Sequence, residues 1–329
     1  MKVAILGAGR IGRVHAASIR ADRRSRIAAV FDVVQGAAEA LAAEHGVAVR
    51  PLDAILADPS IDAVLVASST DTHAELIERA VAAGKAIFCE KPIDLDLARA
   101  RAVQAVTDAY DRPVMMGFNR RFDPNFAALK AALDAGRIGR PETLAVTSFD
   151  PAPPPIDYIA VSGGLFRDMT IHDFDMCAFL FGLPGTVTAH GSNLVDPAIG
   201  AAGDIDTAVV VLSYADGRLA TIRNSRRAPY GYDQRVEVAG SKGLLSVDNE
   251  TQSRVSLATE EGVSIAKPVH FFLERYMRAY EAEWSAFVDA VLDGSPVPAT
   301  VADGVNALML AEAANRSLAE RRSVALSEV

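Results

Sequence analysis

The sequence predicts an α/β chain with two domains, and three observations carry this prediction. Short apolar runs alternate with helical stretches in the first third of the chain, which is typical of a parallel sheet covered on both faces. A glycine-rich turn follows the first apolar run, as in doubly wound Rossmann sheets. Longer strand-like runs with tight turns then favour an α+β domain with a large, mostly antiparallel, open-faced sheet. We place the boundary between residues 119 and 120, so the predicted domains are 1–119 and 120–329.

The first domain is expected to contain short parallel strands separated by helices. Its helical stretches include Asp71–Ala83 and Leu95–Ala109. The run Ala-Val-Leu-Val-Ala at 63–67 is continuously apolar, as expected of a parallel strand that is buried on both faces. The predicted strands are Lys2–Leu6, Ile27–Phe31, Ala63–Ala67, Ala86–Cys89 and Val114–Met116.

The second domain begins with a helix and a strand and continues into a series of strands. Turn signals at 215–217 and 240–243 separate consecutive β-like runs, which indicates antiparallel pairing. The predicted strands are Glu142–Phe149, Thr186–Ser192, Thr207–Tyr214, Leu219–Arg223, Arg235–Ala239 and Leu244–Val247. The predicted helices are Asn125–Ala135, Gly164–Phe181, Phe271–Leu292 and Val301–Ala319, and a proline-rich loop covers Asp150–Pro155.

Composition excludes several classes of protein. Of the 329 residues, 50% are hydrophobic and 23% are charged, which is the profile of a globular protein. The net charge of −9 argues against a nucleic-acid or anionic-membrane partner, because both require a basic face. No run reaches the ~18 apolar residues of a membrane-spanning helix. Cys89 and Cys177 stand outside any zinc spacing, so we expect no metal and a reduced, cytoplasmic setting.

The motif Gly7-Ala8-Gly9-Arg10-Ile11-Gly12 follows a predicted strand and opens a predicted helix. In this context Gly7 makes the tight turn, Gly9 lets a pyrophosphate approach the backbone, and Gly12 lets the helix pack closely on the strand. The free N–H groups of the helix N-terminus favour phosphate. The alternative is an ordinary tight turn, but the position of the motif between strand and helix favours dinucleotide binding.

Asp32 ends the next predicted strand, 20 residues after Gly12. A carboxylate at this position binds both ribose hydroxyls and repels a 2′-phosphate, and no cation follows it, because the next residues are Val33 and Val34. The motif therefore predicts NAD rather than NADP. Ligands of open parallel sheets bind beyond the carboxyl ends of the strands, so we expect a cofactor site lined by Gly7, Gly9, Arg10, Ile11, Gly12, Asp32, Ser68, Thr70, His73, Glu90 and Lys91.

Oxidation of a secondary alcohol needs a base that works near pH 7 and a positive group that favours alkoxide character. Asp168 and His172 are spaced i, i+4 on a predicted helix and so share one face, which Asp175 extends. Histidine is the natural base. The alternative, that His172 and Asp168 are an ordinary structural pair, stays open from the spacing alone.

Lys91 directly follows a predicted strand and has a charge that would lower the pKa of a substrate hydroxyl. A solvated loop lysine paired with Glu90 is the alternative, and the spacing does not separate the two. Arg120 and Arg121 also follow a strand, and they are interpreted either as hydroxyl-binding residues or as an exposed basic pair. We assign no catalysis to His15 or His73, which are expected to have structural roles near the cofactor.

Several longer segments resemble the Gfo/Idh/MocA family of oxidoreductases, and within it the members that act on inositol. The resemblance spans nearly the whole chain. It rests on the glycine motif, on Cys-Glu-Lys-Pro at 89–92, on Gly-Phe-Asn-Arg-Arg-Phe-Asp at 117–123, and on the segments 150–155, 162–175, 191–197 and 224–235. The Glu-Lys-Pro element marks the superfamily, and the later segments are more specific.

The resemblance implies roles for individual residues. Lys91, Asp168 and His172 would be the catalytic trio, with His172 as the base, Asp168 assisting it and Lys91 polarising the reacting hydroxyl. Further substrate contacts are expected at Asn119, Arg120, Asp157 and Tyr232. The resemblance also implies a cis peptide bond before Pro92 and a homotetramer joined through the large sheet.

The implied reaction is the NAD-dependent oxidation of one ring hydroxyl of a cyclic polyol to a ketone, with myo-inositol as the expected substrate and 2-keto-myo-inositol as the product. One departure weakens the substrate assignment: where the family pattern has Ser-Arg-Asp-Pro, this chain has Ser148-Phe149-Asp150-Pro151. This departure leaves a dehydrogenase for another cyclitol or an aldose as an alternative. A non-enzymatic NAD-binding regulator is a further alternative, because the fold alone does not establish the chemistry.

Overall fold

The computed structural model describes residues 1–329, and the chain forms two compact units. The first unit combines Met1–Phe122 with Met277–Leu308, and the second combines Asp123–Tyr276 with Met309–Val329. The chain passes from the first unit to the second after Phe122, returns to the first unit at Met277 and enters the second again at Met309.

The first unit is built on a six-stranded, wholly parallel sheet. The strand order is β3-β2-β1-β4-β5-β6, so the direction of winding reverses between β1 and β4. Ligands of doubly wound sheets bind at such a reversal. The strands are β1 (Lys2–Leu6), β2 (Arg26–Phe31), β3 (Ala48–Val49), β4 (Ala63–Val66), β5 (Ala86–Glu90) and β6 (Val114–Gly117). The predicted Rossmann sheet is confirmed, with β3 as an additional two-residue strand.

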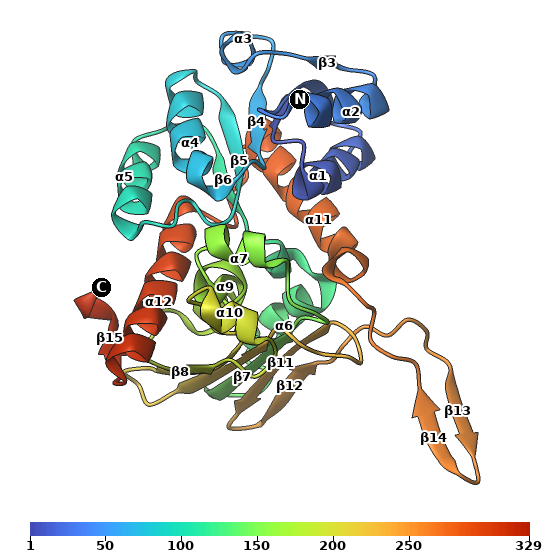
Figure 1. Cartoon of the computed structure of the whole chain (residues 1–329), viewed down its shortest axis with the longest axis vertical. Helices are drawn as coiled ribbons and strands as arrows, with labels where there is room; N and C mark the ends of the chain where they lie inside the picture. The colour runs from blue at the N-terminus through green and yellow to red at the C-terminus, as the bar shows by residue number, and fades with distance from the viewer. The chain divides into compact units, whose positions relative to one another are not determined.

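Helices cover both faces of this sheet. Figure 1 shows α1 and α2 on one side and α4 and α5 on the other. All four residues of β4 are completely buried, as the continuous apolar run predicts. The helices are α1 (Arg10–Ala21), α2 (Gln35–His45), α3 (Leu52–Leu56), α4 (His73–Ala82) and α5 (Leu97–Asp108), with short 3₁₀ turns at η1 (Thr70–Thr72) and η2 (Asn119–Phe122).

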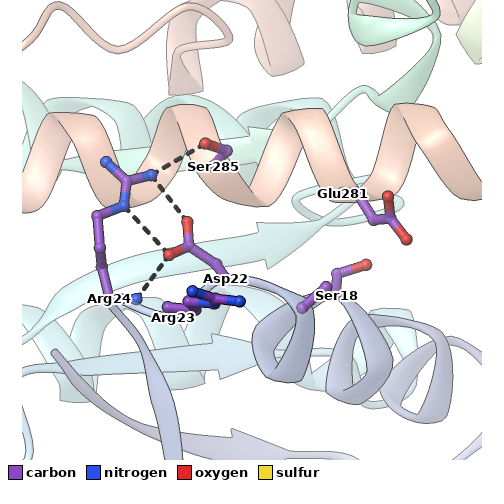
Figure 2. Close-up of a pocket in the computed structure, with 7 residues that line it drawn as sticks. Ser18, Asp22, Arg23, Arg24, Glu281 and Ser285 are labelled. Carbon is purple, nitrogen blue, oxygen red and sulfur yellow. Dashed lines mark hydrogen bonds and ion pairs between the residues drawn. The ribbon is translucent and has the colours of Figure 1, made fainter.

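Most of helix α11 (Phe272–Asp293) packs in the first unit. The fully buried Trp284 lies 5.9 Å from the ring of Phe88, and its indole N–H donates to Ser25 Oγ at 2.9 Å. A surface pocket of about 380 Å³ lies beside this helix. The Arg24 guanidinium donates there to Ser285 Oγ at 3.0 Å and also contacts Asp22, and Figure 2 shows these side chains. The contacts of Trp284 and Ser285 join residues more than 190 positions apart, so local sequence patterns do not reveal them.

The second unit contains a seven-stranded sheet of order β12-β11-β7-β10-β9-β8-β15. All its pairs are antiparallel except β7 with β10, which run parallel, so the predicted mostly antiparallel sheet is confirmed. Helices lie on one side of this sheet in Figure 1. The strands are β7 (Pro141–Phe149), β8 (Thr186–Ser192), β9 (Thr207–Ser213), β10 (Leu219–Ser225), β11 (Asp233–Gly240), β12 (Gly243–Val247) and β15 (Val324–Ala325).

The remaining elements of the second unit include several that the sequence did not predict. These are α7 (Ile156–Ser162), α10 (Pro197–Ala201) and a hairpin of β13 (Ser256–Thr259) and β14 (Gly262–Ile265), which projects from its unit in Figure 1. The predicted helices appear as α6 (Pro124–Asp134), α8 (Leu165–Asp168), α9 (Ile171–Phe181) and α12 (Val301–Glu320). None of the helices is both long and apolar enough to cross a lipid bilayer.

Candidate functional site

The three glycines of the turn after β1 meet different surroundings, and these match the roles expected of them. Gly7 has a φ of +111°, and a Cβ there would lie 2.4 Å from the carbonyl group of Ala67. A Cβ on Gly12 would lie 2.0 Å from the carbonyl oxygen of Gly7, so α1 packs too closely on the turn for any side chain. A Cβ on Gly9, by contrast, would meet nothing within 4 Å. The backbone at Gly9 is therefore open to a ligand.

The N-terminus of α1 begins at this open glycine. Gly9 is the N-cap residue, and no side chain caps the helix. The first N–H groups of a helix lack partners within the helix and favour an anionic ligand. Arg10 is exposed and Ile11 is half-buried in this first turn. The turn thus fits the pyrophosphate of a dinucleotide in both shape and electrostatics.

Asp32 follows β2 and holds the glycine turn. Its carboxylate accepts hydrogen bonds from the backbone N–H of Ala8 at 2.6 Å and of Val34 at 2.8 Å. The two following valines are exposed, Val33 to 87% and Val34 to 62%, so no side-chain cation lies next to Asp32 in sequence. This environment suits an unphosphorylated ribose and opposes a 2′-phosphate.

The ends of β4 and β5 are joined by His73, at the start of α4. Its buried ring lies between two carbonyl oxygens, with Nδ1 2.7 Å from Pro92 O and Nε2 3.1 Å from Ser68 O. Burial lowers the pKa of His73 below its ordinary value. Ser68 Oγ also lies 2.6 Å from Thr72 Oγ1, in the same turn as Thr70. His73 therefore holds together the loops after β4 and β5, which are predicted to line the cofactor site.

Glu90, the last residue of β5, is tied to α1 through His15. Glu90 Oε1 lies 2.7 Å from His15 Nε2, and the His15 ring packs edge-on against Phe88 and Tyr280. A Cβ on Gly117 would lie 3.0 Å from the Glu90 carboxyl carbon, so β6 passes directly beside this group. The Glu90 carboxylate accepts from the Lys91 backbone N–H at 3.3 Å, and the Lys91–Pro92 peptide bond is cis, as the resemblance implies.

The turn η2 brings three predicted polar residues into the interior of the first unit. Asn119, Arg120 and Arg121 are 3%, 5% and 7% exposed, so the interpretation of an exposed basic pair is wrong. Arg121 donates to Pro298 O at 3.0 Å and pairs with Asp303 at 3.1 Å. Although burial alone would raise the pKa of Asp303, Arg121 and the Thr300 N–H hold it below the ordinary value. Arg121 is thus a structural residue that anchors α12.

In the second unit, the predicted single helix over 164–181 is wrong, because it breaks between Asp168 and Ile171. The Thr170 N–H bonds back to Leu165 O at 3.0 Å, one residue further than in an α-helix, and Thr170 Oγ1 donates to Asn224 Oδ1 at 2.9 Å. Met169 and Thr170 nevertheless keep right-handed helical dihedral angles. His172 therefore still follows Asp168 by about one helical turn.

A buried polar network that the sequence did not indicate fixes the start of α9. Asn224 on β10 donates to Asp173 Oδ2 at 2.7 Å, and Asn224 also accepts from Thr170. Asn224 pairs in register with Ser148 on β7, whose hydroxyl donates to Gln234 on β11 at 3.0 Å. These residues form a polar row across three strands beneath α9. His172 and the buried Asp175 are thus carried on a helix that the sheet orients.

Asp168 is contacted by residues from two other segments. Tyr158 on α7 donates its hydroxyl hydrogen to Asp168 Oδ1 at 2.8 Å, and Arg226 lies 3.5 Å from Asp168 Oδ2. The structure thus brings Tyr158 to Asp168, whereas the neighbouring Asp157, which the sequence predicts, is exposed in the first turn of α7. Tyr232, another predicted contact, is only 6% exposed, and its backbone N–H donates to Val269 O at 2.9 Å.

Fold and site together define a dinucleotide-binding oxidoreductase with a separate α+β unit. Two family models match the chain: "Oxidoreductase family, NAD-binding Rossmann fold" over residues 1–118 and "GFO/IDH/MocA C-terminal domain" over residues 126–246. The chain belongs to the Gfo/Idh/MocA family of oxidoreductases, and its first domain binds NAD.

Similar proteins cover the chain from end to end. The inositol 2-dehydrogenase of Rhizobium meliloti is 50% identical, over 99% of this chain and 99% of that protein. The myo-inositol 2-dehydrogenase of Thermotoga maritima is 47% identical, over 100% and 99%. The crystal structure of scyllo-inositol dehydrogenase from Lactobacillus casei, with bound NAD(H) and scyllo-inositol, superposes with a TM-score of 0.92 at 31% identity, over 99% of both chains.

Proposed function

We propose that this enzyme oxidises one secondary hydroxyl of a cyclic polyol to a ketone with NAD, and that it converts myo-inositol to 2-keto-myo-inositol in inositol breakdown. The observation that carries the proposal is the end-to-end match, at 47–50% identity, to enzymes named for this oxidation. The open Gly9 and the uncapped start of α1 support it, because they suit the pyrophosphate.

The proposed roles follow from what alcohol oxidation requires. Bound NAD accepts the hydride from the carbinol carbon. His172 takes the hydroxyl proton, since histidine is the side chain best suited to serve as a general base near neutral pH. Asp168 assists by stabilising the protonated imidazole, and Lys91 stabilises negative charge on the reacting oxygen. Asn119, Arg120, Asp157 and Tyr232 are proposed to bind the remaining hydroxyls.

A substrate panel tests this proposal. The protein is incubated with NAD and, separately, with myo-inositol, scyllo-inositol, other inositol isomers, glucose and related aldoses, while nicotinamide absorbance is followed. The expected result is the highest kcat/KM with myo-inositol. Absence of turnover with every cyclitol would refute the assignment.

A second candidate substrate class is an aldose, and Phe149 is the observation that favours it. Phe149 ends β7 between Ser225 and Asp233 of the neighbouring strands, at the position where the family pattern has arginine. An apolar ring there removes a potential donor to a polyol hydroxyl. A larger kcat/KM for glucose than for any inositol in the same panel would support this alternative. NAD binding without turnover of any compound would indicate a regulator.

Asp32→Ala is expected to weaken NAD binding and to relax discrimination against NADP. The change removes the ribose-binding carboxylate and its repulsion of a 2′-phosphate, an effect of about 1–3 kcal/mol on the difference between the two cofactors. Titrations of both cofactors, followed by nicotinamide fluorescence, measure it. An unchanged ratio of the two Kd values would contradict the role of Asp32.

We infer that the enzyme acts as a homotetramer in the cytoplasm. The open face of the large sheet exposes Val209, Leu219 and Leu244 to between 44% and 54%. The β13–β14 hairpin exposes Leu257, Val263 and Ile265 to more than 60%, as does Val255 directly before it, and an isolated two-stranded hairpin is only marginally stable. Light scattering is expected to give four times the chain mass of 34.8 kDa. A monomer at micromolar concentration would contradict this inference.

A further inference from the structure

Arg226 is a buried arginine of the second unit for which the reaction described above has no role. It follows directly after β10, and it is only 1% exposed. Burying a guanidinium is costly unless acidic partners surround it. Its partners therefore indicate why the fold keeps a charge there.

Two carboxylates flank the guanidinium. Arg226 Nη2 lies 3.5 Å from Asp168 Oδ2 and 3.6 Å from Asp204 Oδ2. The Arg226 main chain is also fixed, because its N–H donates to Asp206 O at 2.8 Å. Arg226 therefore bridges Asp168, which is predicted to assist the base, and Asp204, which the sequence did not single out.

Asp204 is itself tied to the start of the helix that carries Asp168. Leu165 is the first residue of α8, and its backbone N–H donates to Asp204 Oδ1 at 3.0 Å. A Cβ on Gly164 would lie 2.9 Å from that same oxygen, and Gly164 has a φ of +84°, so glycine is required there. Asp204 thus fixes both the guanidinium and the helix on which Asp168 lies.

The carboxylate of Asp168 is held through both oxygens. Oδ2 faces buried Arg226, and Oδ1 accepts from the hydroxyl of Tyr158, which lies on the half-exposed side of the cluster. One guanidinium between two carboxylates leaves the cluster with one net negative charge. If Asp204 were absent, Arg226 would neutralise Asp168.

We propose that Arg226 is a positioning residue that orients the Asp168 carboxylate, and that Asp204 preserves the net negative charge which stabilises the imidazolium of His172. The proposal rests on the proposed polyol oxidation. Arg226 is only 1% exposed, so we assign it no substrate contact and expect it to act through Asp168. Its effect is therefore expected in kcat rather than in cofactor binding.

Arg226→Met, Arg226→Lys and Asp204→Asn test this proposal in the full-length enzyme. Arg226→Met is expected to lower kcat by about 100-fold, as for a misplaced catalytic group, with an unchanged Kd for NAD. Arg226→Lys restores a buried cation and is expected to recover about tenfold of that loss. Asp204→Asn keeps an acceptor for Leu165 and is expected to lower kcat by about tenfold through lost charge alone.

Arg227→Met is the matched control, because Arg227 is the exposed neighbour and donates to Leu194 O. It is expected to keep the activity of the unmodified enzyme. A folded Arg226→Met variant with normal kcat would overturn the proposal. Equal losses in the methionine and lysine variants, in proportion to a lowered Tm, would also overturn it, since they indicate a merely structural role. If Arg226→Met does not fold, Asp204→Asn decides, and normal kcat in that variant overturns the charge role.

Failure of the proposed function has a different signature. In that case the unmodified enzyme shows no turnover with any polyol, and the positioning role of Arg226 is refuted together with the proposed function. Turnover by the unmodified enzyme together with undiminished turnover by Arg226→Met refutes the inference alone.

Discussion

Replacing His172 with alanine is expected to lower kcat by about 10²- to 10⁴-fold, which is the usual contribution of a general base. The variant lacks the proposed base for the hydroxyl proton. The affinity for NAD is expected to stay unchanged, because His172 lies on α9 of the second unit and the glycine turn lies in the first.

Steady-state and single-turnover rates with myo-inositol measure the effect of His172→Ala, and NAD titration measures cofactor binding. His45→Ala is a suitable control, since His45 ends α2 outside the predicted site. Near-normal turnover by His172→Ala would refute the assignment of the base. A parallel loss of NAD affinity would instead indicate that the substitution disturbs the fold.

Gly9→Ala is expected to weaken NAD binding at least tenfold, about 1.4 kcal/mol, while the free energy of unfolding stays nearly unchanged. A methyl group on Gly9 meets no protein atom within 4 Å, and its φ of −70° suits any residue. The methyl group would therefore occupy only the space into which we expect the pyrophosphate to fit.

Two other glycines are matched comparisons for Gly9→Ala. Gly12→Ala places a Cβ 2.0 Å from Gly7 O and is expected to lower both the Tm and NAD affinity. Gly36→Ala, in α2, meets nothing within 4 Å and is expected to raise the Tm slightly without changing NAD binding. Wild-type NAD affinity in Gly9→Ala, measured by calorimetry, would mean that the pyrophosphate does not approach this turn.

The strands of the first unit were predictable because they are buried on both faces and read as apolar runs, as β4 does. Elements that depend on few residues were not predictable. β3 has only two residues, and α7 lies after a proline-rich stretch that indicates a loop. The break before α9 was not predictable either, and Thr170 at this break bonds to Asn224, which is 54 positions away in sequence.

Some residues of the candidate site could likewise be predicted from the sequence, and others could not. The glycine turn and Asp32 are local motifs, so their positions after β1 and β2 could be predicted from spacing, while their contacts with NAD stay a prediction. Arg226 and Tyr158 could not be singled out as partners of Asp168, because nothing in a single sequence indicates which distant arginine or tyrosine faces a given carboxylate. The weak signal was the run Asn-Ser-Arg-Arg at 224–227, which supported only the family resemblance.

The most direct test of polyol oxidation is turnover of myo-inositol carrying deuterium at C2. With NAD and this substrate, we expect 2-keto-myo-inositol, deuterium on the nicotinamide ring of the reduced cofactor, and a lower single-turnover rate than with unlabelled substrate. Reduced cofactor without deuterium, or no reduced cofactor at all, would contradict it.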